Sequence, residues 1–546
     1  MSPRDSHGSL GVVLRDIARR NTDRAAVVDE NGRRTTYADL LGAAGRLANA
    51  FRAWGLRPGD RVAAWMDDGS EYVVLYCAAA LAGLVVTPVN ARYTVYEAAT
   101  ILGDATSRAL VWNATRDGAV EELRDSGRLD GVRLLRVGDG RALDADEWEA
   151  TVAAGADRVD LEVAPESPLI IGYTSGTTGV PKGAVMTHRS VRAVTRQNAA
   201  AYRLPARSVI AMTGSMSFVS VVPSHVLTHL LLAGTVVFMG RWDVPRLLDV
   251  VERERATFTY LPSPVLGEFA TTAAGQEHRW SSLRSILHSA SKASPDALER
   301  LCDVVGSRLV EGWGMTENSG GLMTATSVAD LTDPGRRSHA LSTVGRPIPG
   351  YDVRVVDGEL YVRGPGLVAG YWQRPDATAA TFRDGWFATG DMGSVDEEGY
   401  VTVLERRTDL IVSGGMNVYP AEVEAVIAEV PGVAEVAVVG VPHPRWGQTV
   451  VAVVVPEPGR EVDVEAVNRH CRTRLASYKK PTEVISVSSL PRTVSLKVSR
   501  AGARRLAEEN LGTRGEADRP QVLAALHRQG CGAADHHRPG RRHITP

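Results

Sequence analysis

The chain has 546 residues, 44% hydrophobic and 23% charged, and its 62 Lys and Arg nearly balance 64 Asp and Glu, so the formal net charge is −2. This composition is typical of a globular protein with several domains, and it excludes collagen, coiled coils and disulfide-stapled miniproteins. The near-neutral balance gives no reason to expect nucleic acid or a membrane surface as a partner.

Apolar periodicity in the first half of the chain predicts alternating helices and strands. Helical spacing runs through residues 39–54 and 71–82, and short apolar strands are expected at 61–66 and 84–87. Further short strands, separated by helix-length sequence, are expected at 209–213, 235–239, 257–261 and 285–287. Such alternation is typical of an α/β sheet with crossover helices.

Neither a leader peptide nor a membrane span is expected. The first ten residues lack an apolar stretch, and the longest apolar run, residues 72–86, is shorter than the roughly 20 residues that a bilayer requires. The four cysteines lie far apart, which indicates free thiols in a reducing compartment such as the cytoplasm: Cys77, Cys302, Cys471 and Cys531.

The pattern of apolar and turn-forming residues changes in the second half of the sequence. Residues 344–404 contain short alternating strands between Gly, Pro and Asp, which predict a small antiparallel or barrel-like unit. We therefore expect an α/β fold with a large N-terminal domain over residues 1–405, built from α/β subdomains and the barrel-like unit. A small, mobile α+β C-terminal domain is expected over residues 406–500. Residues 501–546 end in a stretch rich in Arg, His, Gly and Pro and are expected to be a disordered tail.

The strongest local signal is YTSGTTGVPKG at residues 173–183, directly after an apolar strand. Hydroxyl groups, glycines that let the backbone approach a ligand, and a mobile cation suit a polyphosphate. The residues concerned are Thr174, Ser175, Gly176, Thr177, Thr178, Gly179 and Lys182. The spacing differs from that of a Walker loop.

This loop resembles a signature of the adenylate-forming superfamily, which includes acyl-CoA and aryl-CoA synthetases, firefly luciferase and peptide-synthetase adenylation domains. The resemblance covers roughly residues 10–500, and further motifs follow in the family's order. They are EGWGMTE at 311–317, GWFATGD at 385–391, ERRTDLIVSGGMNVYP at 405–420 and LPRTVSLKVSR at 490–500. Several ordered motifs identify a family far more specifically than one motif does.

The resemblance implies that a carboxylic acid and ATP form an acyl-adenylate, which is then transferred to the thiol of CoA. The loop from Thr174 to Lys182 would hold the β- and γ-phosphates, and Thr316 would contact the α-phosphate. Glu317 would bind Mg²⁺, a hard cation that prefers carboxylate oxygen. Asp391, assisted by Arg406, would accept hydrogen bonds from the ribose. The adenine would lie against Ser289, Ala290 and Ser291 and against Gly312, Trp313, Gly314 and Met315.

The resemblance also assigns roles in the small domain. Lys497 would be its catalytic lysine, because a point charge on a long stem can reach both the acid and the α-phosphate. The family has glycine where this chain has Leu496, whose Cβ restricts the backbone. Thr408 would be the hinge of a domain rotation, after which Gly414 and Gly415 would line the path of the CoA thiol.

Two lysine-bearing segments leave alternatives open. The sequence YKK at residues 478–480 resembles a YKxP segment of the family, and its lysines would either meet a CoA phosphate or remain solvated. Lys292, in the predicted adenine loop, would either pair with a polar group on the acid or remain solvated.

The acyl pocket is expected around residues 215–222, where Met216, Phe218 and Val222 are apolar. The family often has an aromatic residue and a His here, and this chain lacks that His. It also lacks, between residues 213 and 225, the Asp that peptide-synthetase domains use to pair an α-ammonium group, so an α-amino acid is disfavoured. A short or medium fatty acid, a branched acid and an aryl acid all remain open.

Three functions are consistent with the sequence. The first is an ATP-dependent acid–CoA ligase whose partners are a small carboxylic acid, ATP and CoA. The second is a standalone ligase that loads the phosphopantetheine of a carrier protein. The third is a nucleotide-binding pseudoenzyme, suggested by Leu496 and by Thr408, which stands where the family commonly has Lys or Asp. The chain is expected to be a monomer or a homodimer.

Overall fold

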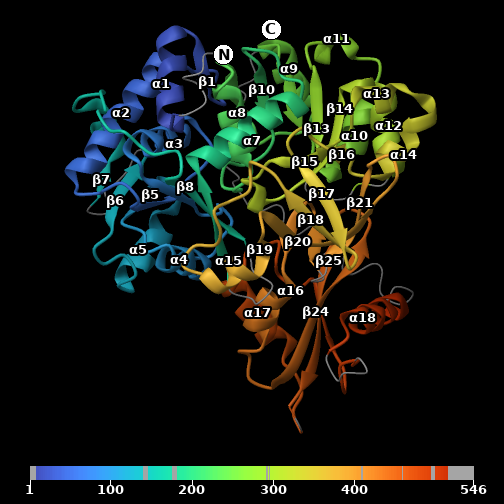
Figure 1. Cartoon of the computed structure of the whole chain (residues 1–546). Coiled ribbons are helices and arrows are strands. Elements are labelled where there is room, and N and C mark those ends of the chain that lie inside the picture. The colour runs from blue at the N-terminus through green and yellow to red at the C-terminus, as the bar shows by residue number, and fades with distance from the viewer. Residues whose placement is uncertain are drawn as a thin grey trace, which may run out of the picture.

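The computed structural model describes residues 8–138, 145–174, 181–289, 293, 295–406, 410–457, 459–492 and 498–514. A large N-terminal lobe contains three sheets, and a small C-terminal lobe contains one (Figure 1). This mixed α/β architecture confirms the predicted fold class. The sheets change between Arg406 and Ile411, where the domain boundary is expected. Residues 8–406 are called the large lobe below, and residues 410–514 the small lobe.

The first sheet of the large lobe has seven strands in the order β7-β6-β5-β3-β4-β8-β9. All neighbours are parallel except β8 and β9. The strands are β3 (Arg61–Trp65), β4 (Val85–Pro88), β5 (Ala109–Asn113), β6 (Arg133–Val137), β7 (Asp146–Glu147), β8 (Pro168–Thr174) and β9 (Lys182–Thr187). The helices of this region are α1 (Leu10–Arg20), α2 (Tyr37–Ala53), α3 (Ser70–Ala82), α4 (Val95–Asp104), α5 (Asp117–Asp125) and α6 (Trp148–Ala153).

The second sheet has nine strands in the order β16-β15-β14-β13-β12-β10-β11-β1-β2. The strands are β1 (Ala25–Val28), β2 (Arg34–Thr36), β10 (Val209–Met212), β11 (Thr235–Phe238), β12 (Phe258–Tyr260), β13 (Ser285–His288), β14 (Leu309–Gly314), β15 (Leu322–Ala325) and β16 (Arg346–Pro347). The six neighbouring strands β14, β13, β12, β10, β11 and β1 of this sheet are parallel to one another. The helices are α7 (His188–Ala201), α8 (Thr228–Leu230), α9 (Val244–Glu254), α10 (Leu266–Ala273), α11 (Glu277–Trp280), α12 (Pro295–Val305), α13 (Val328–Thr332) and α14 (Pro334–Ser342).

The third sheet is the small unit predicted for residues 344–404. Its five strands pair antiparallel, in the order β17-β18-β20-β19 with β21 beside β20. They are β17 (Asp352–Val356), β18 (Glu359–Arg363), β19 (Phe382–Arg383), β20 (Trp386–Val395) and β21 (Val401–Arg406), with α15 (Pro375–Thr381) before β19.

The small lobe has one five-stranded sheet whose two faces are covered by different helices. The strands are β22 (Ile411–Ser413), β23 (Met416–Val418), β24 (Val433–His443), β25 (Gly447–Pro456) and β26 (Glu483–Ser486). Alternate residues of β24 and β25 contribute to two separate apolar clusters, as expected for a sheet with two buried faces. One cluster includes α16 (Pro420–Ile427) and α17 (Val464–Arg474), and the other includes α18 (Arg500–Arg514).

Helix α18 differs from the expectation of a tail that is disordered after residue 500. Ala503 and Ala507 are fully buried against the sheet, and Leu506 and Leu511 pack beside them. The first part of the predicted tail therefore belongs to the small lobe. A short apolar stripe at the start of the segment orders this helix against the sheet, although the last residues of the chain are rich in Arg and His.

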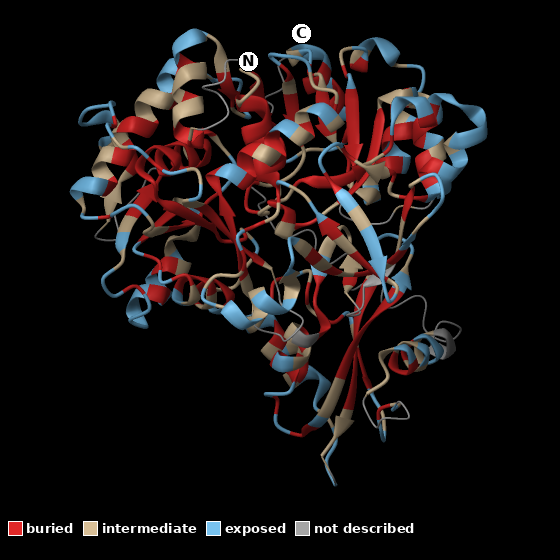
Figure 2. Ribbon diagram, viewed as in Figure 1, coloured by how far each residue is buried: buried red, intermediate tan, exposed pale blue. Residues whose placement is uncertain are grey.

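Local signals explain why the first helices form where they do. Thr36 caps α2, because its side chain accepts a hydrogen bond from the backbone of Asp39 while the Asp39 carboxylate accepts one from Thr36. Helix α3 is buried on every side, and with β4 it forms the long apolar run of residues 72–86. Buried residues follow the strands of both large sheets (Figure 2). In the part of the chain that the structure describes, no helix combines the length and apolarity needed to cross a membrane.

Candidate active site

The predicted phosphate-binding motif begins on β8 and ends on β9, which form an antiparallel pair. Thr174 and Lys182 are opposite each other in this pair, and the Thr174 hydroxyl donates to the Lys182 carbonyl at 3.5 Å. The turn between these two strands, predicted to contribute Ser175, Gly176, Thr177, Thr178 and Gly179, lies outside the described residues. The two described ends of the motif therefore lie on β8 and β9, the last two strands at one edge of the seven-stranded sheet.

Tyr371 connects the phosphate-motif lysine to the predicted metal ligand. Its hydroxyl donates to Oε1 of Glu317 at 3.1 Å, and the Lys182 Nζ lies 5.6 Å from the centre of its ring. Tyr371 is held there because its backbone bridges to Ala184 of β9. Tyr371 lies in none of the motifs that the sequence predicts for the site.

Glu317 lies in a short helical turn directly after β14. The backbone N–H of Val368 donates to the Glu317 carbonyl at 2.9 Å, which fixes the turn against the segment that carries Tyr371. The turn closes through N–H groups of Asn318 and Gly320, both of which donate to the Met315 carbonyl. Lys182, Tyr371 and Glu317 thus form one continuous contact between two sheets.

The predicted acyl segment packs between the strand before the phosphate motif and the turn after Glu317. A Cβ added at Gly172 of β8 would lie 2.1 Å from a methyl group of Val219, and one added at Gly320 would lie 2.5 Å from the Cα of Ser220. Gly320 also has a φ of +77°, which glycine adopts without strain. Both glycines therefore allow three predicted site segments to converge.

The apolar residues predicted for the acyl pocket have different exposures. Met216 and Val222 are fully buried, whereas Phe218 is partly exposed. Oδ1 of Asp68 accepts hydrogen bonds from the Met216 backbone at 2.7 Å and from the Ser215 hydroxyl at 3.0 Å. Asp68, which was not predicted from the sequence as a site residue, anchors the start of the predicted acyl segment to the seven-stranded sheet.

The structure brings together the predicted adenine and ribose contacts. The indole Nε1 of Trp313 in β14 donates to Oδ2 of Asp391 in β20 at 2.9 Å. Arg406 is the register partner of Asp391 across β20 and β21, and its side chain lies outside the described part of the structure. Gly312, Gly314 and Met315 surround Trp313 along β14 and its end.

A buried polar chain lies where the predicted adenine loop leaves β13. Nδ1 of His288 contacts Oε2 of Glu311 at 2.5 Å, and Nε2 of His288 contacts the Ser263 hydroxyl at 2.9 Å. Burial raises the pKa of Glu311, although the adjacent His288 opposes this. The Tyr260 hydroxyl donates to the Ser289 carbonyl at 3.3 Å. These contacts fix the backbone before the loop, whereas Ala290, Ser291 and Lys292 lie outside the described residues.

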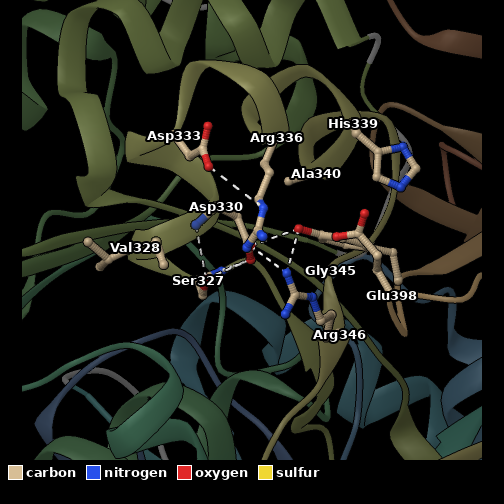
Figure 3. Close-up of polar contacts among 12 residues, drawn as sticks. Ser327, Val328, Asp330, Asp333, Arg336, His339, Ala340, Gly345, Arg346 and Glu398 are labelled. Carbon is tan, nitrogen blue, oxygen red and sulfur yellow. Dashed lines mark hydrogen bonds and ion pairs between the residues drawn. The ribbon is translucent and has the colours of Figure 1, made fainter.

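A second polar cluster joins the nine-stranded sheet to the small antiparallel sheet. Arg346 of β16 points toward Asp330 near the start of α13 (Figure 3), with Nη2 2.7 Å from Oδ1. The Tyr400 hydroxyl donates to the same oxygen at 2.7 Å, and the Arg346 guanidinium lies 4.2 Å from the Tyr400 ring centre. Asp330 and Tyr400 are each 1% exposed, so this cluster is a rigid support for the strands that carry Trp313 and Asp391.

The described small-lobe residues include only part of the predicted site. Gly414 and Gly415 form the turn between β22 and β23, and the Gly414 N–H donates to the Trp446 carbonyl at 2.8 Å. Trp446 is 41% exposed, and the Arg445 guanidinium lies 4.6 Å from its ring centre. Thr408, Leu496 and Lys497 lie outside the described residues.

Comparison with family models identifies two domains. A model described as AMP-binding enzyme matches residues 14–372, and a model described as AMP-binding enzyme C-terminal domain matches residues 422–497. The two matches fall in the large and small lobes, respectively.

Curated relatives align along most of the chain. A feruloyl-CoA synthase from Amycolatopsis sp is 34% identical over 89% of this chain and 96% of its own length. The long-chain-fatty-acid–CoA ligase FadD13 of Mycobacterium tuberculosis is 32% identical over 85% of this chain and 92% of its own length. A fatty acid–[acyl-carrier-protein] ligase, ScoC of Streptomyces coeruleorubidus, is 33% identical over 87% and 92%.

Solved structures show the same architecture across both lobes. The amide bond synthetase McbA from Marinactinospora thermotolerans is 27% identical, with a TM-score of 0.80 over 91% of this chain and 99% of that one. A double mutant of o-succinylbenzoate CoA synthetase (MenE) from Bacillus subtilis, bound with its product analogue OSB-NCoA, is 26% identical. Its TM-score is 0.78 over 90% of this chain and 97% of that one.

Proposed function

The chain belongs to the family of AMP-binding enzymes, and we propose that it is an acid–CoA ligase that works through an acyl-adenylate. The observation that carries this proposal is the contact from Lys182 through Tyr371 to Glu317, beside the acyl segment. It supports a site where a cation, a metal-binding carboxylate and an apolar substrate region meet. Such a site suits attack of a carboxylate on a nucleotide phosphate.

In the first half-reaction, a carboxylate oxygen of the acid attacks the α-phosphorus of ATP, and the bond to the β-phosphate oxygen breaks. Pyrophosphate leaves and acyl-adenylate remains. Negative charge grows on the phosphate oxygens, so Lys182, the hydroxyl-rich loop and Thr316 would stabilise the transition state. Lys497 would bridge the acid and the α-phosphate. Asp391, oriented by Trp313, would accept hydrogen bonds from the ribose hydroxyls.

We propose that Glu317 holds Mg²⁺ together with phosphate oxygens of ATP. Within the residues that the structure describes, no three His, Cys, Asp or Glu side chains are grouped to hold a metal ion. A single carboxylate fits Mg²⁺, which usually keeps several waters and binds through one or two carboxylates plus substrate phosphates. When bound, the ion would neutralise charge on the phosphates. Tyr371 would orient Glu317 by occupying one side of Oε1.

The acid is proposed to be apolar near its carboxyl end. Met216 and Val222 are buried and Phe218 is partly exposed, and all three join the core of the large lobe. Asp68 lies beside this segment, but its Oδ1 accepts hydrogen bonds from Met216 and Ser215. This use of Asp68 agrees with the expectation that an α-amino acid is disfavoured. Fatty, branched and aryl acids remain candidates.

The second half-reaction is proposed to use CoA as the acceptor. The thiol sulfur would attack the acyl carbonyl carbon, AMP would leave, and the thiol proton would pass to solvent or to a base. The exposed Trp446 and its neighbour Arg445, beside the turn that contains Gly414, support CoA, because they could stack on a base and pair with a phosphate. The 33% identity with a carrier-protein ligase keeps phosphopantetheine on a carrier as the second candidate acceptor.

The reaction is proposed to take place in the cytoplasm. Cys77, Cys302 and Cys471 are free and buried, which suits a compartment that keeps thiols reduced.

The test is a pyrophosphate-release assay of the full chain with ATP, Mg²⁺ and a panel of fatty, branched and aryl acids. Acid-dependent release without CoA would support adenylation. Mass spectrometry of parallel reactions with CoA, a phosphopantetheinylated carrier protein or a simple amine then identifies the acceptor. ATP binding without release with any acid would instead support the pseudoenzyme.

A further inference from the structure

Lys479 of the small lobe is buried between two carboxylates, one from each lobe. Its Nζ donates to Oε1 of Glu97 in α4 at 2.8 Å and to Oε1 of Glu422 in α16 at 2.6 Å. The Lys479 side chain is 2% exposed, and those of Glu97 and Glu422 are 7% and 11% exposed. Lys479 is therefore neither a solvated lysine nor accessible to a CoA phosphate in this arrangement, the two alternatives that the sequence left open.

The large-lobe half of this contact is held in place by hydrogen bonds within the large lobe itself. Oε2 of Glu97 accepts hydrogen bonds from the backbone and the hydroxyl of Thr94, so Glu97 caps its own helix. Oε1 remains directed at Lys479. The ring of Tyr93 adds a second large-lobe contact, with its centre 4.5 Å from the ammonium nitrogen. A preorganised carboxylate and an aromatic face form a socket for one cation.

The charge of Lys479 is retained in this socket. Burial alone would lower its pKa, but Tyr93, Glu422, Tyr478 and Glu97 together raise the pKa well above its usual value. A buried charge that loses its partner is strongly unfavourable. The lobes therefore separate along this surface only when Lys479 and Glu97 both regain water or other partners.

The socket engages one particular face of the small lobe. Helix α17, on the face that also carries α16, contacts α4 of the large lobe, and the Arg474 guanidinium lies 4.9 Å from the Tyr96 ring centre. Helix α18 covers the opposite face of the sheet and lies away from the large lobe (Figure 1). The described residues on either side of Lys497, namely Arg492 and Val498, pair with each other, and Val498 packs into the α18 cluster.

Arg492 and Val498, which flank the segment predicted to contain the catalytic lysine, therefore belong to the α18 face, whereas Lys479 attaches the α17 face to the large lobe. An orientation that brought Lys497 to the phosphate-binding residues would turn the α18 face inward. The contact between Lys479 and Glu97 would then be broken. The two lysines consequently serve different orientations of the same lobe.

We propose that Lys479 is a positioning residue for thioester formation, which holds the small lobe with its α18 face turned away from the large lobe, the reverse of the orientation that adenylation by Lys497 would require. This inference rests on the proposed function, in which Lys497 acts in the first half-reaction. Loss of the Lys479–Glu97 contact should slow acyl transfer to CoA and spare acyl-adenylate formation. Glu97 acts through Lys479 and should show the same selectivity.

The experiment measures both half-reactions separately in the full chain. Adenylation is followed by pyrophosphate release with hydroxylamine as the acyl trap, and acyl transfer by CoA thioester formation from presynthesised acyl-adenylate. The variants are Lys479→Met, which keeps side-chain length without charge, and Lys479→Arg, which keeps the charge. Glu97→Gln tests the same contact from the large lobe and retains an oxygen that can cap α4. Arg472→Met, at an exposed position of α17, is the matched control.

For Lys479→Met and Glu97→Gln we expect acyl transfer to fall by about tenfold or more while adenylation stays within about twofold. Lys479→Arg should recover part of the transfer rate, and Arg472→Met should resemble the wild type. Retained adenylation also demonstrates that the variants fold. Equal losses in both half-reactions, or unchanged acyl transfer, would overturn the inference. A wild-type chain that adenylates no acid would instead overturn the proposed function, and the inference with it.

Discussion

The indole of Trp313 donates a 2.9 Å hydrogen bond to the carboxylate of Asp391, although these residues lie on strands of two different sheets. Trp313 is 8% exposed and Asp391 4%, so the bond is shielded from water. A charge-assisted bond of this kind fixes the direction of the acceptor. The predicted base-side residue therefore also orients the predicted ribose-side residue.

Trp313→Phe should weaken ATP binding more than it slows catalysis. Phenylalanine keeps an aromatic ring but leaves the Asp391 carboxylate without this donor, and loss of one hydrogen bond to a charged group is worth about 1.5–3 kcal/mol. We expect KM for ATP to rise by about tenfold or more, with a smaller change in kcat. Steady-state kinetics at saturating acid test this. A normal KM for ATP would contradict the orienting role.

Glu317→Gln and Tyr371→Phe should both change the dependence of adenylation on Mg²⁺, and to different degrees. The first replaces the proposed metal ligand, so activity should fall by about 100-fold. The second removes only the hydroxyl that donates to Oε1, so the half-saturating Mg²⁺ concentration should rise by a few-fold. Pyrophosphate release is titrated with Mg²⁺ for each variant, beside nucleotide binding without metal. Wild-type turnover of Glu317→Gln at limiting Mg²⁺ would disprove the ligand assignment.

Strands and helices with strong periodicity were predictable from the sequence. The helix expected at residues 39–54 is α2 (Tyr37–Ala53), and the strand expected at 61–66 is β3 (Arg61–Trp65). Local pattern sufficed here because α2 buries one apolar stripe at helical spacing, whereas β3 is a short apolar run buried on both faces of its sheet. Ordered motifs also led to the family, which the family models confirm.

Contacts between distant segments were not predictable in the same way. Tyr371 contacts Glu317 because the backbone of Tyr371 pairs with Ala184 of β9. Pairing between segments so far apart in the chain cannot be predicted from the periodicity of a single sequence. For Lys479 the sequence left open a CoA phosphate contact or solvation, and neither alternative included Glu97, because that carboxylate lies in the other lobe. The roles assigned to Ser175 and Lys497 remain predictions, since these residues lie outside the described part of the chain.

Lys497→Ala should abolish adenylation and leave acyl transfer from presynthesised acyl-adenylate largely intact. Lys497 is proposed to bridge the acid and the α-phosphate, which no longer react in the second step. We expect adenylation to fall by at least about 100-fold, because a charge that acts only in the transition state is lost. The two half-reactions are measured separately, as for Lys479. Equal loss in both would argue against the assigned role.

The large lobe should lose stability as pH falls below about 6.5, the ordinary pKa of an unfolded histidine. Burial lowers the pKa of His188 to about 4, of His225 to about 3 and of His229 to about 4. These side chains stay neutral in the fold while the unfolded chain takes up protons, so acid favours unfolding until the folded pKa is reached. At pH 5 each contributes a loss of about 2 kcal/mol.

His229→Asn tests this pH dependence while it retains a donor for the His225 carbonyl. Urea unfolding at pH 7 and pH 5 should show that the variant loses about 2 kcal/mol less stability between the two pH values than the wild type. His278→Asn, at an exposed position of α11, should keep the wild-type difference. An unchanged difference in His229→Asn would mean that His229 does not stay neutral in the fold.

The small lobe should tolerate removal of residues 515–546 but not removal of α18. A chain that ends at Arg514 keeps Ala503 and Ala507, which are fully buried against β24 and β25. Residues 515–546 are predicted from their composition to be a tail that does not pack on the fold, so we expect unchanged thermal stability and turnover. A chain that ends at Ser499 would expose the apolar face of the sheet, and its melting temperature should fall by about 5 °C or more. Ala503→Asp, which places a charge in the same contact, should lower it in a similar way. Differential scanning calorimetry of the three chains checks this, and loss of stability in the chain that ends at Arg514 would show that residues after α18 also pack on the fold.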